Sequence, residues 1–188
     1  MNSTIKLFVT GGTFDKEYNE LTGEMYFKET HIFEMLNLGR CRIPTSVETL
    51  MMTDSLHMKE SQIKYIVQRC AEDHNVRIVI THGTDRMTDT ARRLAKTVRD
   101  KTVVLTGAMV PYRFGSSDGL FNLGSALSFV QILPPGVYIA MNGHIFDWDN
   151  VRKNRELGIF EPLRSRKSNT PRRKSGKSVP AGTDASTV

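Results

Sequence analysis

The sequence predicts a single α/β domain in which a parallel sheet carries helices on both faces, a three-layer arrangement of the Rossmann or flavodoxin type. Three observations favour it. Short apolar runs rich in β-branched residues recur along the chain. Segments with helical periodicity separate them, an alternation typical of right-handed crossovers. Polar motifs follow directly after the apolar runs, where parallel sheets form their ligand crevices.

The expected elements follow from these patterns. Strands are predicted at 5–10, 77–81, 102–106 and 137–141, with a weaker candidate at 47–52. Helices are predicted at 31–38, 59–74, 86–98 and 119–132. In the second helix, Ile63, Ile66 and Cys70 recur at spacings of three and four and mark one buried face. Phe121 and Phe129 are at helical spacing in the last helix and are expected in the core.

The excess positive charge is confined to one end of the chain. Of 188 residues with a net charge of +6, residues 164–188 hold seven of the 26 Lys and Arg and one of the 20 Asp and Glu, so residues 1–163 are formally neutral. The last stretch is rich in Ser, Pro, Gly and basic residues and has too few apolar residues to form a core. We expect a folded domain at 1–163 and a basic, disordered tail at 164–188.

Composition also excludes several classes of protein. No apolar run approaches the roughly 20 residues that span a bilayer, so a membrane partner is not expected. The first residues lack a secretory signal pattern, and two cysteines do not make a disulfide scaffold, which together predict a cytoplasmic protein. The neutral body shows no basic, aromatic face, which argues against nucleic acid as a partner.

Polar motifs end the predicted strands and should meet at one edge of the sheet. They are Thr10–Thr13 (TGGT), Thr81–Asp85 (THGTD), Thr106–Met109 (TGAM) and, beyond the last strand, Asn142 and Lys153. Because the carboxyl ends of parallel strands lie along one edge, the motifs reinforce one another.

Each motif taken alone has a structural explanation as well as a functional one. Thr13 could be a nucleophile after a tight glycine turn, or a threonine that hydrogen-bonds its own backbone. Thr84 or Asp85 could cap the following helix. Lys153 could be a solvated loop lysine or, if it folds into the crevice, the middle of a Thr84–Lys153–Asp85 relay.

Three segments together resemble the bacterial-type asparaginases: TGGTF at 10–14, THGTDRMTDTA at 81–91 and VVLTGAMVPYRFGSSDGLFNL at 103–123. The whole chain is most similar to the short-chain members, which consist of the catalytic domain alone. The resemblance implies hydrolysis of the side-chain amide of L-asparagine to L-aspartate and ammonia through an acyl-enzyme. It implies Thr13 as the nucleophile, assisted by Tyr18 on the following loop, with Tyr26 as the competing candidate. Thr84, Lys153 and Asp85 would form the second relay.

The resemblance also implies a substrate-binding set and partners. Asp85 would hold the α-ammonium group and Ser55 the α-carboxylate, while Leu56 stands where many relatives carry a polar residue. The backbone at Gly12, Gly83 and Ala108 completes the pocket. No cofactor or metal is implied, and the histidines and cysteines show no ligand spacing. A homo-oligomer, dimer or tetramer, is expected.

Two other functions stay open at this point. The domain could be an amidase for another substrate, either glutamine or an aminoacyl-tRNA-linked amide. It could also be a non-catalytic amino-acid-binding module that keeps the fold.

Overall fold

The computed structural model describes residues 4–164. The predicted tail at 164–188 therefore lies, apart from Arg164, outside the described residues. Among the described helices, none is both long and apolar enough to cross a lipid bilayer.

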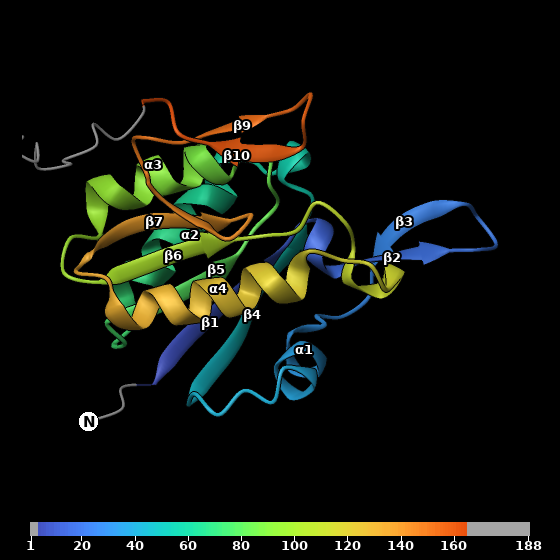
Figure 1. Cartoon of the computed structure of the whole chain (residues 1–188), viewed down its shortest axis with the longest axis horizontal. Helices are drawn as coiled ribbons and strands as arrows, with labels where there is room; N and C mark the ends of the chain where they lie inside the picture. The colour runs from blue at the N-terminus through green and yellow to red at the C-terminus, as the bar shows by residue number, and fades with distance from the viewer. Residues whose placement is uncertain (1–3, 165–188) are drawn as a thin grey trace, which may run out of the picture.

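A six-stranded sheet forms the centre of the domain, in the strand order β4-β1-β5-β6-β7-β8 (Figure 1). Its strands are β1 (Ile5–Gly11), β4 (Thr45–Thr53), β5 (Arg77–Thr81), β6 (Thr102–Thr106), β7 (Gly136–Met141) and β8 (His144–Asp147). The first five in this order run parallel, as predicted. β8 pairs antiparallel with β7 across a two-residue turn at Asn142–Gly143, so the sheet is mixed at one edge. The asparagine–glycine pair is a strong hairpin signal, because both residues take positive φ here.

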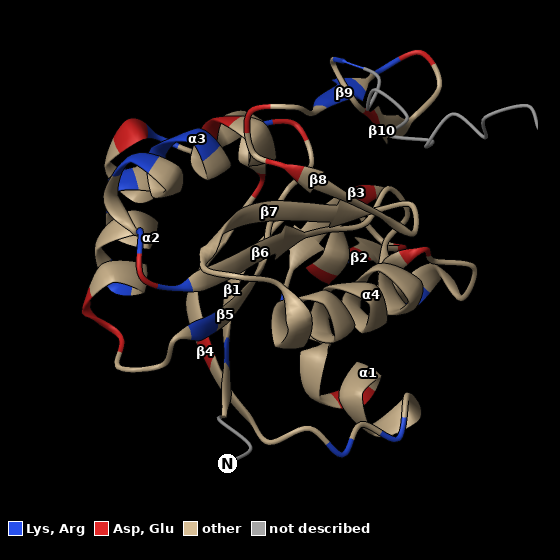
Figure 2. Ribbon diagram, turned by 60° about the vertical axis from the view of Figure 1, so that its left-hand side comes forward, with Lys and Arg blue, Asp and Glu red and all other residues tan. Residues whose placement is uncertain are grey.

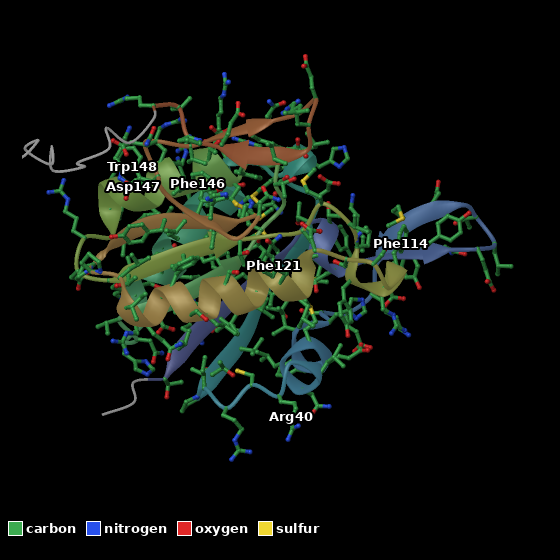
Figure 3. All side chains as sticks on the ribbon, in the orientation of Figure 1. Arg40, Phe114, Phe121, Phe146, Asp147 and Trp148 are labelled. Carbon is green, nitrogen blue, oxygen red and sulfur yellow. The ribbon has the colours of Figure 1, made fainter. Side chains whose placement is uncertain are left out.

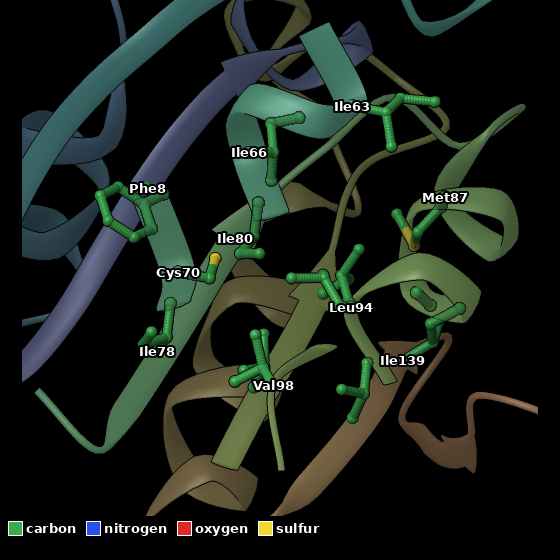
Figure 4. Packing of buried hydrophobic residues seen from close by; sticks show 14 of the residues in the cluster. Phe8, Ile63, Ile66, Cys70, Ile78, Ile80, Met87, Leu94, Val98 and Ile139 are labelled. Atoms are coloured by element: carbon green, nitrogen blue, oxygen red, sulfur yellow. The ribbon is translucent and has the colours of Figure 1, made fainter. Parts of the chain in front are cut away.

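Helices cover both faces of the sheet, which confirms the three-layer prediction. They are α1 (Ile32–Leu38), α2 (Glu60–Glu72), α3 (Met87–Thr97) and α4 (Gly119–Ile132). On one face, α2 and α3 pack Ile63, Ile66 and Leu94 against Ile78 and Ile80 of β5 (Figure 4). On the other face, α1 and α4 pack against the sheet around Val79 and Val104. In α2, the buried residues are Ile63, Ile66 and Cys70, the face that its periodicity predicts.

Two antiparallel hairpins lie outside the main sheet and were not predicted. They are β2 (Lys16–Asn19) with β3 (Glu24–Phe27), and β9 (Arg152–Asn154) with β10 (Ile159–Glu161). Their strands have three or four residues, and most of their side chains are polar, so they lack the apolar alternation that marks a strand. The first hairpin extends away from the domain, and the second lies near α3 (Figure 1).

One core expectation is wrong. Phe121, labelled on α4 in Figure 3, is 62% exposed, whereas Phe129 packs against the buried cluster of that face. The Phe121 ring lies over the turn at Gly143, where an added Cβ would come within 3.0 Å of the ring. Helical spacing places Phe121 near the core stripe, but its ring covers the turn after β7 instead.

Candidate functional site

The ends of β1 and β5 meet backbone to backbone at two glycines. Gly12 has φ +82°, and a Cβ on it would lie 2.5 Å from both the Cα and the N of Gly83. A side chain is therefore excluded at Gly12 by both conformation and space. The contact brings the next residue of each segment, Thr13 and Thr84, to the same edge of the sheet. It also explains why each motif carries a glycine before its threonine.

Lys153 joins Thr84 and Asp85 in one hydrogen-bonded cluster. Its Nζ donates to Thr84 Oγ1 at 2.7 Å and to Asp85 Oδ1 at 3.0 Å. Neither residue caps the following helix, since α3 begins at Met87 after Arg86 and has no side-chain cap. The capping explanation is therefore wrong, and both side chains are turned toward the lysine.

The β9–β10 hairpin carries Lys153 to this cluster. Opposite Lys153 in the hairpin is Phe160, which is buried in the core beside α3 and holds the hairpin against the domain. The lysine side chain is 13% exposed, so the interpretation as a solvated loop lysine is wrong as well. An ammonium group so far removed from water needs acceptors, and Thr84 and Asp85 supply them.

Ser55 closes the cluster from the end of β4. Its side chain is buried, and its Oγ accepts a hydrogen bond from the Asp85 backbone N–H at 3.2 Å. A Cβ on Gly83 would lie 2.4 Å from this oxygen, so the serine occupies the space that the glycine leaves. Because the Ser55 oxygen accepts, its own O–H can still donate to a bound group.

Asp54, just before Ser55, anchors the start of the first hairpin. It forms an ion pair with Lys16, two residues before Tyr18. Its other oxygen accepts from the Leu56 N–H at 2.9 Å. Burial by itself would raise the pKa of Asp54, but the contacts with Lys16 and the Leu56 N–H outweigh it and lower that pKa.

Two of the predicted residues are largely exposed to solvent. The Tyr18 side chain is 56% exposed on β2, and within residues 4–164 its hydroxyl has no hydrogen-bond partner. Leu56 is likewise exposed. The competing Tyr26 donates its hydroxyl to Glu17 Oε2 at 3.2 Å, and this bond raises the pKa of the phenol. Of the two tyrosines, Tyr18 is thus the one whose hydroxyl is uncommitted.

Comparison with known proteins decides the family. The family model described as asparaginase, N-terminal, matches residues 4–185. This chain belongs to the asparaginase family. The match continues past residue 163, the predicted domain boundary, into residues that the structure does not describe.

Individual relatives agree with this assignment. An L-asparaginase from Thermococcus kodakarensis is 40% identical over 84 residues, covering 44% of this chain and 26% of the relative. A subunit of a glutamyl-tRNA(Gln) amidotransferase from Methanococcus vannielii is 29% identical over 185 residues, covering 93% of this chain and 41% of that protein. The solved structure of a probable cytoplasmic L-asparaginase from Campylobacter jejuni has a TM-score of 0.74 at 30% identity, covering 85% of this chain and 53% of that one. The chain therefore spans about half of that solved structure and less than half of each curated relative.

Several residues that support the candidate site were missed in the sequence. His82 is fully buried, with Nδ1 2.8 Å from the Gly83 carbonyl and Nε2 2.9 Å from Thr90 Oγ1. A carbonyl can only accept, so Nδ1 carries the proton and Nε2 accepts from the threonine. Burial lowers the pKa of His82 from 6.5 to about 4, so the ring is neutral. The HGTD motif thus contains a structural histidine that fixes the backbone before Thr84.

A second missed feature is an amide network between the strand ends and the lysine hairpin. Asn122 Nδ2 donates to the Gly107 carbonyl at 3.0 Å and to Asp118 Oδ2 at 2.9 Å. Its Oδ1 accepts from the Asn142 N–H at 3.0 Å, and Asn142 Oδ1 accepts from the Phe160 N–H at 2.9 Å. The sequence signals for this network were the segments DGLFN at 118–122 and MNG at 141–143, and Asn142 was predicted only to follow a strand. The network connects α4 and β7 to the hairpin that carries Lys153.

Asp118 also shapes the loop after Ala108. Its carboxylate accepts from the backbone N–H groups of Met109, at 2.9 Å, and of Val110, at 3.0 Å. Both Ser117 and Asp118 contact the start of α4: Ser117 Oγ accepts from the Gly119 N–H at 2.9 Å, and the Asp118 carbonyl accepts from the Asn122 N–H at 3.0 Å. Ala108 is buried beside this loop, so its contribution to a site is limited to its backbone.

The arrangement has the parts that acyl transfer needs. Thr13 offers a hydroxyl directly after Gly12, and Thr84 offers a second hydroxyl whose oxygen already accepts from Lys153. The Thr84 O–H is therefore free to donate into the site. A hollow of about 730 Å³ lies elsewhere, between α2 and α3, and contains none of these residues. The candidate site is therefore identified by the polar groups that meet at this edge of the sheet, and not by the volume of a cavity.

Proposed function

We propose that this chain hydrolyses the side-chain amide of L-asparagine to L-aspartate and ammonia. The observation that carries the proposal is the hydrogen-bonded cluster of Thr84, Lys153 and Asp85, with Lys153 Nζ 2.7 Å and 3.0 Å from its two partners, beside the Gly12–Thr13 turn. Membership of the asparaginase family and an L-asparaginase relative at 40% identity support the same reaction.

The mechanism we propose has two steps. Thr13 Oγ attacks the amide carbon, its proton passes to the leaving nitrogen, and ammonia departs to leave an ester on Thr13. Water then attacks the ester, aspartate is released, and Thr13 regains its proton. Backbone N–H groups near Gly12 and Thr84 would stabilise the oxyanion in both steps. Tyr18 would assist Thr13 once its hairpin closes over the substrate.

Substrate recognition uses the charged part of the cluster. The Asp85 carboxylate would hold the α-ammonium group, and the Ser55 hydroxyl would donate to the α-carboxylate. This orientation agrees with the Ser55 Oγ accepting from the Asp85 N–H, because that contact leaves the serine proton available. Gly83, Ala108 and Leu56 complete the walls.

The test compares ammonia release from L-asparagine and L-glutamine by wild type, Thr13→Ala and Lys153→Met. We expect wild type to release ammonia from asparagine and both variants to lose at least a hundredfold in kcat, the scale of removing a nucleophile or an acid–base partner. Matched controls are Thr97→Ala and Lys64→Met, two exposed residues outside the cluster, which should keep wild-type rates. A folded wild type that is inert on both amides would refute the proposal.

A second candidate function rests on one comparison. The alignment with the amidotransferase protein covers 93% of this chain, much more than the alignments with curated asparaginases. The same site would then release ammonia from an amide for a tRNA-linked acceptor. Equal turnover of glutamine and asparagine would favour this candidate, and strict preference for asparagine would exclude it. A chain that binds asparagine without hydrolysing it would instead be a binding module.

We also infer a cytoplasmic location and a homo-oligomer, dimer or tetramer. Both cysteines, Cys41 and Cys70, are unpaired, which agrees with a reducing compartment. Analytical ultracentrifugation would give the number of protomers, and a single monomer peak would contradict the oligomer.

A further inference from the structure

Asp85 has two cationic neighbours. Besides Lys153 Nζ at 3.0 Å, the Nη2 of Arg155 lies 3.5 Å from the same carboxylate oxygen. The two cations differ in exposure, since the lysine side chain is 13% exposed and the arginine 70%. Lys153 is therefore the buried partner of Asp85, whereas Arg155 is its solvent-exposed partner.

The turn that carries Arg155 is held in place. Asn154 Oδ1 accepts from the N–H groups of Glu156 and Leu157, both at 3.1 Å, which folds the chain tightly after β9. Gly158 closes the turn with φ +65°, and a Cβ there would lie 3.6 Å from the Met109 methyl group, in the loop after β6. The Arg155 backbone is therefore positioned at the site, and Figure 2 shows the basic residues of β9 and its turn on this hairpin.

The charges around Asp85 do not balance. One carboxylate faces two cations, so this end of the site carries an excess positive charge. The exposed Arg155–Asp85 pair stabilises the fold very little, because water screens it and the arginine must be held in one conformation. Its main effect is on the electrostatics that a bound molecule meets.

Arg152, on the same hairpin, provides a contrast. It is similarly exposed, at 64%, but pairs with Glu161 at 2.6 Å and not with Asp85. Its charge is balanced by its own partner, so its removal should leave the charge at Asp85 unchanged.

We propose that Arg155 is a specificity-determining residue that disfavours an α-ammonium group and favours a free carboxylate in the substrate. The inference rests on the proposed function, because it assumes that Asp85 faces the α-substituents of a small amide. Relative to its effect on L-asparagine, Arg155 favours anionic β-amides that lack the α-ammonium group, of which succinamate is the simplest. An ammonium group near Asp85 is repelled by Arg155, whereas a carboxylate is attracted.

The test measures the ratio of kcat/KM for L-asparagine to kcat/KM for succinamate. In low salt, Arg155→Gln should raise this ratio about fivefold, the factor for one unit charge about 4 Å away in water. Arg155→Lys should keep the wild-type ratio, and Arg152→Gln should do the same. Because the arginine is exposed, the difference between Arg155→Gln and wild type should shrink as salt is added. A ratio that Arg155→Gln leaves unchanged in low salt would overturn the inference.

A binding measurement separates this inference from the proposed function. Titration calorimetry with L-aspartate and succinate gives the same charge comparison without any turnover. A shift in the ratio of the two Kd values in Arg155→Gln, in a chain that hydrolyses neither amide, supports the role of Arg155 and refutes the proposed reaction. Hydrolysis of asparagine with no shift in either ratio refutes Arg155 alone. Hydrolysis of neither amide, together with binding of neither ligand, refutes both.

Discussion

Because of His82, the free energy of unfolding of this protein should decrease as the pH is lowered from 6.5 to 4. The ring is fully buried and both nitrogens are hydrogen-bonded, to the Gly83 carbonyl and to Thr90. Burial lowers its pKa to about 4, and the nearby Arg86 cation acts in the same direction. In the unfolded chain the ring would titrate at the ordinary value of about 6.5.

The sign and size of the effect follow from linkage. Since the folded pKa is the lower one, the unfolded chain binds the extra proton between the two values, and acid therefore favours unfolding. The stabilisation is fully present above pH 6.5 and is lost as the pH falls to about 4. A pKa difference of about 2.5 corresponds to about 3 kcal/mol of unfolding free energy.

The assay is urea unfolding of wild type and His82→Asn at pH 7, 6, 5 and 4. Asparagine keeps a donor for the Gly83 carbonyl but cannot titrate. The His82→Asn variant should be less stable than wild type at pH 7 by about 1–3 kcal/mol, because the contact with Thr90 and part of the packing are lost. This deficit should disappear at pH 4, because only the wild type loses the stabilisation that comes from the lowered pKa of His82. The exposed His57→Gln variant serves as control and should follow wild type. A deficit of constant size from pH 7 to pH 4 would refute the reasoning.

Three further predictions concern the supports of the site. Gly83→Ala should destabilise the fold by about 1–3 kcal/mol, since its Cβ would lie 2.4 Å from Ser55 Oγ, while Gly124→Ala on α4, which has open space, should be neutral or stabilising in the same urea assay. Asn142→Ala should lower kcat at temperatures where the variant is still fully folded, because it disconnects the Lys153 hairpin from β7. A loss of activity that appears only at temperatures where the variant unfolds would contradict a positioning role. Tyr18→Phe should reduce kcat at least tenfold and Tyr26→Phe should not, because only the Tyr26 hydroxyl is already bonded, to Glu17; the reverse result would exchange the two assignments.

Much of the fold follows from local patterns. The five parallel strands and four helices were expected close to their observed positions, because continuous apolar runs and a 3.6-residue period report burial directly. The hairpins were missed because their strands are short and polar, so their pairing depends on turns and on contacts with the domain. Phe121 was wrongly predicted to be in the core, because the spacing of residues along a helix does not show that a neighbouring turn, here at Gly143, packs against the ring.

The candidate site divides in the same way. The sequence by itself determined which residues end the strands, and the sheet rule then predicted that Thr13, Thr84 and Asp85 share one edge. Only the tertiary structure decided that Lys153 reaches that edge, because a lysine 68 positions after Asp85 is brought there by a hairpin that Phe160 and Asn142 anchor. The structure alone also decided that Arg155 faces the same carboxylate. Charge and hydroxyl groups are visible in a sequence, but their partners are fixed by long-range packing.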